Sequence, residues 1–164
     1  MSRADTLPAA ANADAGTARV ELGELGTSLG FMMRIAQLRL FERFFERFGG
    51  LDLKPGEFSL LWVIHLNPGI RQGGLAHALR IKPAHMTKLI RKLEEQGIVT
   101  RHIPDDDRRS VELTLTEPGK RFVEERQADF FGADDYHGNA LTRAERLQLA
   151  ELLQKYCGPD WWHE

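Results

Sequence analysis

The chain has 164 residues and a mass of 18.6 kDa, with 42% apolar and 28% charged residues and a formal net charge of −2. These values are typical of a globular domain with a buried core, and they exclude a chain that is disordered throughout. The single cysteine, Cys157, excludes an intramolecular disulfide, and no apolar run is long enough to span a membrane. Residues 1–20 lack the apolar core of a secretion signal, so we expect a cytoplasmic protein.

The chain begins with a polar tail and a long apolar helix. Residues 1–18 are rich in Ala, Asp, Thr and Gly and predict a flexible tail. Within residues 19–50, apolar side chains at steps of three and four predict a helix from about Val20 to Phe48. Its apolar residues occupy two sides of the helix, more than one small core can cover, so we expect a dimerisation helix that packs against a partner subunit.

The rest of the chain alternates between short helices and two strand-like runs. Turn and cap residues such as Pro55, Gly97 and Thr116 mark the ends of these elements. The pattern predicts helices over residues 55–66, 72–79, 83–96, 117–131 and 143–156, and a β-hairpin of strands 98–103 and 110–115.

The charge of the chain is unevenly distributed. Residues 71–92 contain six Lys or Arg and no acidic residue, so the remainder of the chain carries −8. A local patch of this kind is suited to binding phosphate, although the total charge is close to zero. A basic run is more often a solvated helix face, but here a helix-turn-helix pattern precedes it and a hairpin with paired arginines follows it.

The helix predicted over residues 83–96 has one apolar face and one polar, basic face. At 100° per residue, Met86, Leu89, Ile90 and Leu93 share the core side. The opposite side carries small, hydrogen-bonding and basic residues, which suit the major groove of DNA: Ala84, His85, Thr87, Lys88, Arg91 and Lys92. Arg108 and Arg109 at the tip of the hairpin could reach a narrow minor groove.

Three sequence blocks carry a family resemblance: Leu75-Ala76, residues 86–101 (MTKLIRKLEEQGIVTR), and Asp107-Arg108-Arg109-Ser110 followed by residues 115–119 (LTEPG). With these blocks, residues 53–119 resemble the multiple-antibiotic-resistance regulator (MarR) family of winged-helix repressors. Gln72-Gly73-Gly74 departs from the family pattern, because two glycines stand where the helix opens.

The resemblance implies a mainly helical fold with a small β-hairpin wing: a winged helix-turn-helix over residues 51–117 and an all-helical dimerisation lobe from residues 19–50 and 118–164. It also implies a homodimer that binds double-stranded DNA at a pseudo-palindromic operator. By the family pattern, Asp107 would pair with Arg109 in the wing and hold it for insertion into the minor groove. The expected DNA-binding residues are Arg71, Gln72, Lys82, Pro83, Ala84, His85, Thr87, Lys88, Arg91, Lys92, Arg101, Asp107, Arg108, Arg109 and Ser110.

Members of the family typically bind a small effector, which releases the repressor from DNA. The aromatic and apolar residues here suggest an aromatic, anionic ligand such as an aromatic acid or its coenzyme A thioester, with lining residues Phe31, Arg34, Ile35, Leu38, Phe58, Trp62 and His65. Each apolar residue of this set could instead belong to the core or the dimer interface. Arg34 could bind the ligand's carboxylate or form a salt bridge within the protein.

Other functions find less support in the residues. Thiol redox sensing would have to use Cys157, which has no cationic neighbour closer than Lys155. A winged helix could also serve protein contacts alone. The six histidines are scattered, no catalytic motif is present, and Asp105-Asp106-Asp107 lacks the spacing of a metal site. We therefore expect no enzyme, no cofactor and no bound metal.

Overall fold

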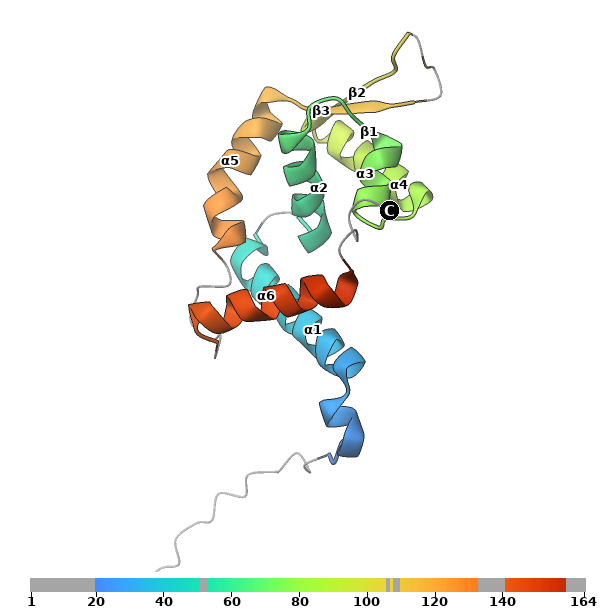
Figure 1. Cartoon of the computed structure of the whole chain (residues 1–164). Coiled ribbons are helices and arrows are strands. Elements are labelled where there is room, and N and C mark those ends of the chain that lie inside the picture. Colours follow the sequence, from blue (N-terminus) through green and yellow to red (C-terminus); the bar gives the residue numbers. More distant parts are fainter. Residues whose placement is uncertain (1–19, 51–52, 106, 108–109, 133–140, 159–164) are drawn as a thin grey trace, which may run out of the picture. The chain divides into compact units, whose positions relative to one another are not determined.

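The computed structural model describes residues 20–50, 53–105, 107, 110–132 and 141–158 (Figure 1). The chain divides into two compact units, residues 1–39 and residues 40–164. The expected tail over residues 1–18 lies outside the described residues. The elements in chain order are a 3₁₀ helix Gly23–Thr27, α1 Leu29–Phe48, α2 Pro55–Leu66, β1 Ile70–Arg71, α3 Gln72–Ala78, α4 Pro83–Glu95, β2 Val99–His102, β3 Glu112–Leu115, α5 Glu117–Phe131 and α6 Arg143–Cys157.

The first long helix is shorter than the sequence predicts. We expected it to begin near Val20, but α1 begins at Leu29, after a separate 3₁₀ helix and an extended Ser28. Gly23 lies in the left-handed region at φ +52°, a conformation that an α-helix cannot include. The carbonyl of Ser28 accepts the first helical hydrogen bond, from the N–H of Met32 at 2.9 Å. Apolar periodicity alone could not reveal this break.

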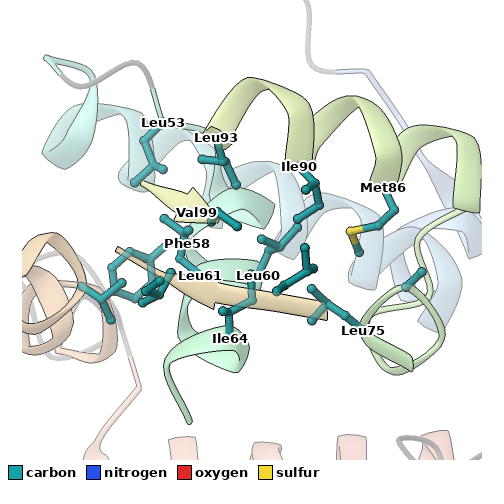
Figure 2. Close-up of a cluster of buried hydrophobic side chains, with 14 of the residues drawn as sticks. Leu53, Phe58, Leu60, Leu61, Ile64, Leu75, Met86, Ile90, Leu93 and Val99 are labelled. Atoms are coloured by element: carbon teal, nitrogen blue, oxygen red, sulfur yellow. The ribbon is translucent and has the colours of Figure 1, made fainter. Parts of the chain in front are cut away.

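The core of the second unit lies where α2, α3, α4 and the strands meet (Figure 2). Phe58, Leu60, Leu61 and Ile64 of α2 are completely buried, or nearly so. They are surrounded by apolar residues from every neighbouring element, including Leu53, Leu75, Met86, Ile90, Leu93, Val99, Leu113, Leu115 and Val123. Because α2 buries more than one side, it forms the centre of this unit.

The end of α1 packs with α2 and α5 in the same unit. Phe44 and Phe48 are buried there, and Phe44 lies edge-on to Phe130 of α5 at a centroid distance of 6.3 Å. Phe130 also stacks on Phe58 of α2 at 4.2 Å. Arg47 forms an ion pair with Asp129, which joins the last turns of α1 and α5.

The strands form an antiparallel sheet in the order β1-β3-β2. The predicted hairpin of β2 and β3 is confirmed, with Val99 opposite Leu115 and His102 opposite Glu112. The sequence did not predict β1, which pairs Ile70 with Leu113. A strand of two residues is too short to show an alternating pattern, and only its hydrogen bonds to β3 reveal it.

The predicted helix ends are confirmed by their hydrogen bonds. Thr116 caps α5, because its Oγ1 accepts from the N–H of Gly119 at 3.0 Å. Thr142 and Glu145 form the predicted capping box of α6, with the Thr142 N–H donating to Glu145 Oε2 at 2.7 Å. The hydrogen bonds from the backbone and side chain of Thr142 lower the pKa of the Glu145 carboxyl below its usual value.

Candidate nucleic-acid interface

α3, α4 and the hairpin lie together at one end of the second unit (Figure 1). A turn of four residues, 79–82, joins α3 to α4. The N–H of Arg80 donates to His77 O at 3.1 Å and that of Ile81 donates to Ala76 O at 2.9 Å, the pattern of a Schellman motif. Together α3, this turn and α4 form a helix-turn-helix, and the hairpin is the adjacent wing.

The two faces of α4 separate as the sequence predicts. Met86, Ile90 and Leu93 are buried and Leu89 is half-buried. The opposite face is exposed and carries the small, hydrogen-bonding and basic side chains Pro83, Ala84, His85, Thr87, Lys88 and Arg91, with Lys82 exposed just before the helix. A helix with this face exposed can enter a major groove without burying an apolar side chain against DNA.

Gln72 and Thr87 join the two helices of the motif. The Nε2 of Gln72, in the first turn of α3, donates to Thr87 Oγ1 at 3.2 Å. The Thr87 hydroxyl in turn donates to the carbonyl of Pro83, one turn earlier in α4, at 3.0 Å. The other amide atom, Gln72 Oε1, is buried and has no hydrogen-bond partner within the described structure.

Lys92 makes a different kind of contact from the other basic residues of α4. Its Nζ lies 3.4 Å from Glu57 Oε1, and the Glu57 side chain is only 3% exposed. Glu57 also accepts a hydrogen bond from the backbone N–H of Lys54 at 3.0 Å. A buried carboxylate requires such partners. The structure therefore directs the Lys92 ammonium towards α2, whereas Lys88 and Arg91 extend from the exposed face.

The wing is tied to the helix-turn-helix at its base. Arg71, at the end of β1, lies with Nη1 3.5 Å from Oδ2 of Asp107 in the wing loop. The N–H and the hydroxyl of Ser110 both donate to Asp107 O, at 3.0 and 3.1 Å. The expected partner of Asp107, Arg109, lies outside the described residues, as does Arg108. Among the described residues of the loop, Asp107 therefore contacts both Arg71 and Ser110.

Arg101 is the remaining basic residue expected at the interface. It lies on β2, and its Nη1 is 3.5 Å from Glu94 Oε2 near the end of α4. Both groups are partly exposed. This pair links the base of the wing to the C-terminal turn of α4, although an exposed ion pair of this kind contributes little to stability.

The residues expected around an effector separate into two groups. Phe58 is completely buried and stacks on Phe130, so it is a core residue, the alternative that the sequence left open. Trp62 and His65 are half-buried and stacked on each other at 5.6 Å. The remaining four, Phe31, Arg34, Ile35 and Leu38, belong to the first unit. Arg34 is exposed there and makes no ion pair with the described residues of the single chain.

An apolar pocket of about 240 Å³ opens in the second unit, among residues that the sequence did not indicate. Its lining comes from the second half of α1, the start of α2 and the end of α5: Leu40, Phe41, Arg43, Phe44, Phe48, Pro55, Phe130 and Phe131. None of the expected effector residues lines it. The three segments that form it are distant in the sequence. The α1 and α5 residues were assigned to the dimerisation lobe and Pro55 to the winged helix-turn-helix, so only their packing reveals the pocket.

A metal cluster and a membrane-spanning helix each set requirements for the described part of the chain. Its His, Cys, Asp and Glu residues form no group of three that could hold a metal ion. None of its helices combines the length and the hydropathy that crossing a bilayer requires. Cys157 is exposed at the end of α6.

The comparisons with known proteins point to one family. The sequence model of the MarR family matches residues 53–111. A putative transcriptional regulatory protein for the hcr operon of Thauera aromatica is 30% identical over 149 residues, which cover 90% of each chain. The transcriptional repressor CouR bound to a 23-mer DNA duplex is similar in structure, with a TM-score of 0.77, 31% identity, and coverage of 84% of this chain and 98% of that one.

A second solved structure is similar in fold. CouR from Rhodococcus jostii RHA1 bound to p-coumaroyl-CoA has a TM-score of 0.70 at 21% identity and covers 82% of this chain and 95% of its own. At this identity the likeness shows a shared fold.

Proposed function

The chain belongs to the MarR family of transcriptional regulators, and from this premise we propose that α4 and the wing are its DNA interface. The observation that carries the proposal is the exposed face of α4. In that face, Lys88 and Arg91 flank the uncharged Ala84 and Thr87, and no acidic residue lies between positions 71 and 92. Basic side chains can contact phosphates while the small ones approach base edges.

The charges within the helix-turn-helix divide into two roles. Arg71, Lys92 and Arg101 form ion pairs with Asp107, Glu57 and Glu94, which hold β1, α4 and the wing together. Lys82, Lys88 and Arg91 remain exposed for phosphate. We assign the electrostatic part of DNA binding to this second group and to Arg108 and Arg109 of the wing tip.

The DNA interface can be tested with Lys88→Ala and with Lys120→Ala as its matched control. Lys120 lies on α5 and pairs with Glu117, away from α4. Each lysine that contacts a phosphate contributes about 0.9 to the slope of log K against log salt. We expect Lys88→Ala to weaken duplex binding and to reduce that slope by about one. Lys120→Ala should leave both quantities close to wild type, and equal losses in the two variants would contradict the assignment.

The wing carries its own test. Arg109→Ala should weaken binding to a selected operator, whereas Lys120→Ala should not, in a fluorescence anisotropy titration. If Arg109→Ala binds as tightly as wild type, the wing does not contact the minor groove.

We also propose that the pocket at the end of α1 receives a small aromatic effector. Five phenylalanines line it, together with Arg43. A cavity of about 150 Å³ can bind benzene in another protein, so 240 Å³ is sufficient for a substituted aromatic ring. One fold relative was solved with p-coumaroyl-CoA, whose acyl group is aromatic. A ligand here would contact α1, α2 and α5 at once, and it releases DNA only if it favours an arrangement that fits DNA poorly.

The effector proposal is tested by Leu40→Trp, which places an indole in the pocket, beside Leu38→Trp, two residues earlier and outside the pocket lining. Because both residues lie on the helix expected to contact the partner subunit, each variant is first shown by light scattering to have the wild-type mass. A panel of aromatic acids and thioesters is screened for release of the wild-type chain from duplex DNA. We expect active compounds to lose their effect on Leu40→Trp and to keep it on Leu38→Trp. No response of the wild type to any aromatic compound, or equal responses from both variants, would contradict the pocket assignment.

Thiol sensing and a winged helix for protein contacts have less support. The relatives are named as transcriptional regulators, and the exposed Cys157 has no cationic neighbour in the sequence closer than Lys155. A winged helix that only contacts proteins would show no affinity for DNA, so the salt titration above also tests this alternative.

A further inference from the structure

The hydroxyl of Thr87 is already used within the protein, although the side chain lies on the exposed face of α4. It donates its hydrogen to Pro83 O at 3.0 Å and accepts one from Gln72 Nε2 at 3.2 Å. A threonine hydroxyl has a single hydrogen to donate. If the oxygen and nitrogen of the Gln72 amide were exchanged, the hydroxyl hydrogen of Thr87 would still be used within the protein, because it could then be donated to Gln72 Oε1.

Gln72 is itself held in the position that it needs for this contact. Its backbone N–H donates to Val111 O at 2.8 Å, which fixes the start of α3 against the strand region. Its Oε1 is buried and so is not available to a base edge. Gln72, which the sequence indicated as a DNA contact, thus contacts Thr87 within the protein.

With its hydrogen donated to Pro83 and one of its two lone pairs taken by Gln72, the Thr87 hydroxyl has nothing left to donate and at most one acceptor site, so the methyl group is the other group that Thr87 can offer. Thr87 lies in the N-terminal half of α4, the part of a recognition helix whose side chains reach base edges. In the major groove the apolar group available is the C5-methyl of thymine. On the basis of the proposed function, we propose that Thr87 is a specificity-determining residue that recognises a thymine by methyl–methyl contact, with Gln72 holding its hydroxyl away from the DNA.

The test begins with the full chain selecting duplexes from a random-sequence library. Each thymine of the selected duplex is then replaced in turn by deoxyuridine, which lacks only the C5-methyl. Burying one methyl group is worth about 0.8 kcal/mol, or about fourfold in affinity. We expect wild-type binding to weaken about fourfold at one thymine in each half-site and to change little at the others.

Two variants of Thr87 separate the methyl from the hydroxyl. Thr87→Ser keeps both hydrogen bonds but lacks the methyl, and should bind the thymine and deoxyuridine duplexes equally. Thr87→Val keeps a methyl but lacks the hydroxyl, and should retain the fourfold difference. Lys88→Ala should weaken binding to both duplexes by the same factor and leave their ratio unchanged.

The opposite outcomes overturn the proposal. A Thr87→Ser variant that still distinguishes thymine from deoxyuridine, or a Thr87→Val variant that no longer does, would show that Thr87 does not act through its methyl. A wild-type chain that binds its selected duplex but is insensitive to every replacement would refute the inference alone. A chain that enriches no sequence would instead contradict the proposed function, and this inference with it.

Discussion

At the scale of single residues, the turn of the helix-turn-helix contains an unusual backbone conformation. Arg80 has φ +51°, in the left-handed region that is costly for residues with a side chain. Gly97 occupies the equivalent position after α4, at φ +70°, with the same pair of backbone hydrogen bonds. The Schellman motif after α4 therefore has glycine, the residue that it favours, at its left-handed position, whereas the motif after α3 has an arginine there.

Replacing Arg80 should show this cost. We expect Arg80→Gly to be about 1 kcal/mol more stable than Arg80→Ala, because both lack the side chain and only alanine is strained at positive φ. Urea unfolding at one fixed protein concentration measures the difference. Gly97→Ala should lose a similar amount, since no atom lies near its added methyl and only the backbone strain acts. Equal stability of the two Arg80 variants would contradict this explanation.

Gly119 is required for a different reason, a close approach between two backbones. A Cβ on Gly119 would lie 2.2 Å from the carbonyl oxygen of Ile98, where the first turn of α5 crosses the start of β2. We expect Gly119→Ala to lose about 1–3 kcal/mol of stability through overpacking. Gly56→Ala, in the first turn of α2 with no atom within 4 Å, is the matched control and should be neutral or slightly stabilising.

At the scale of elements, the ion pair of Lys92 and Glu57 joins the recognition helix to α2. Glu57 is the buried charged residue of the described core, at 2% exposure. Removing Lys92 would leave the buried Glu57 carboxylate without an opposite charge, at a cost below the roughly 3–5 kcal/mol of a fully buried pair, because Lys92 is 31% exposed. We therefore expect the pair to fix the position of α4 more than it contributes charge to DNA binding.

Lys92→Met is the corresponding variant. We expect it to lower the stability of the chain and the preference for a selected operator over random DNA, while the salt slope of binding stays near wild type. Combining it with Glu57→Gln should restore part of the lost stability, because the carboxylate no longer lacks a partner. A reduction of the salt slope by about one would instead show that Lys92 contacts phosphate.

At the scale of the whole molecule, the single chain exposes apolar side chains on the helices at both ends. On α1, Leu29, Met32, Leu40 and Phe45 are about half exposed. On α6, the exposed apolar residues are Leu147, Leu149, Leu152, Leu153 and Tyr156, and no described residue of that helix is buried. Monomeric proteins rarely leave so much apolar surface uncovered. These helices are therefore the proposed surface for a second copy of the chain.

Light scattering tests the dimer directly. We expect a species of about 37 kDa, twice the chain mass of 18.6 kDa. Leu152→Lys should shift the mass towards that of the monomer and weaken operator binding, because two half-sites would no longer be engaged together. Arg143→Ala, a polar change on the same helix, should leave the mass unchanged. A wild-type monomer would refute this interpretation of α1 and α6.

The sequence by itself determined most of the elements and the face of α4 that the DNA proposal uses. Helix ends marked by Pro55, Gly97, Thr116 and Thr142 were correct because caps and turn residues act within a few positions of the chain. The apolar and basic faces of α4 were correct because they follow from helical geometry alone. The predicted start of α1 was wrong and the strand β1 was not predicted. A short 3₁₀ segment and a two-residue strand leave no periodic pattern in the sequence.

Only the tertiary structure decided which side chains act together. Nothing in the spacing of Glu57 and Lys92, 35 positions apart, indicates that they form a partly buried ion pair. Likewise, the sequence does not indicate that Gln72 and Thr87 are hydrogen-bonded, which depends on the packing of α3 against α4. The aromatic pocket also exists only because α1, α2 and α5 pack together. Charge and periodicity are properties of a segment, whereas pairing and burial depend on contacts between distant segments, which folding alone creates.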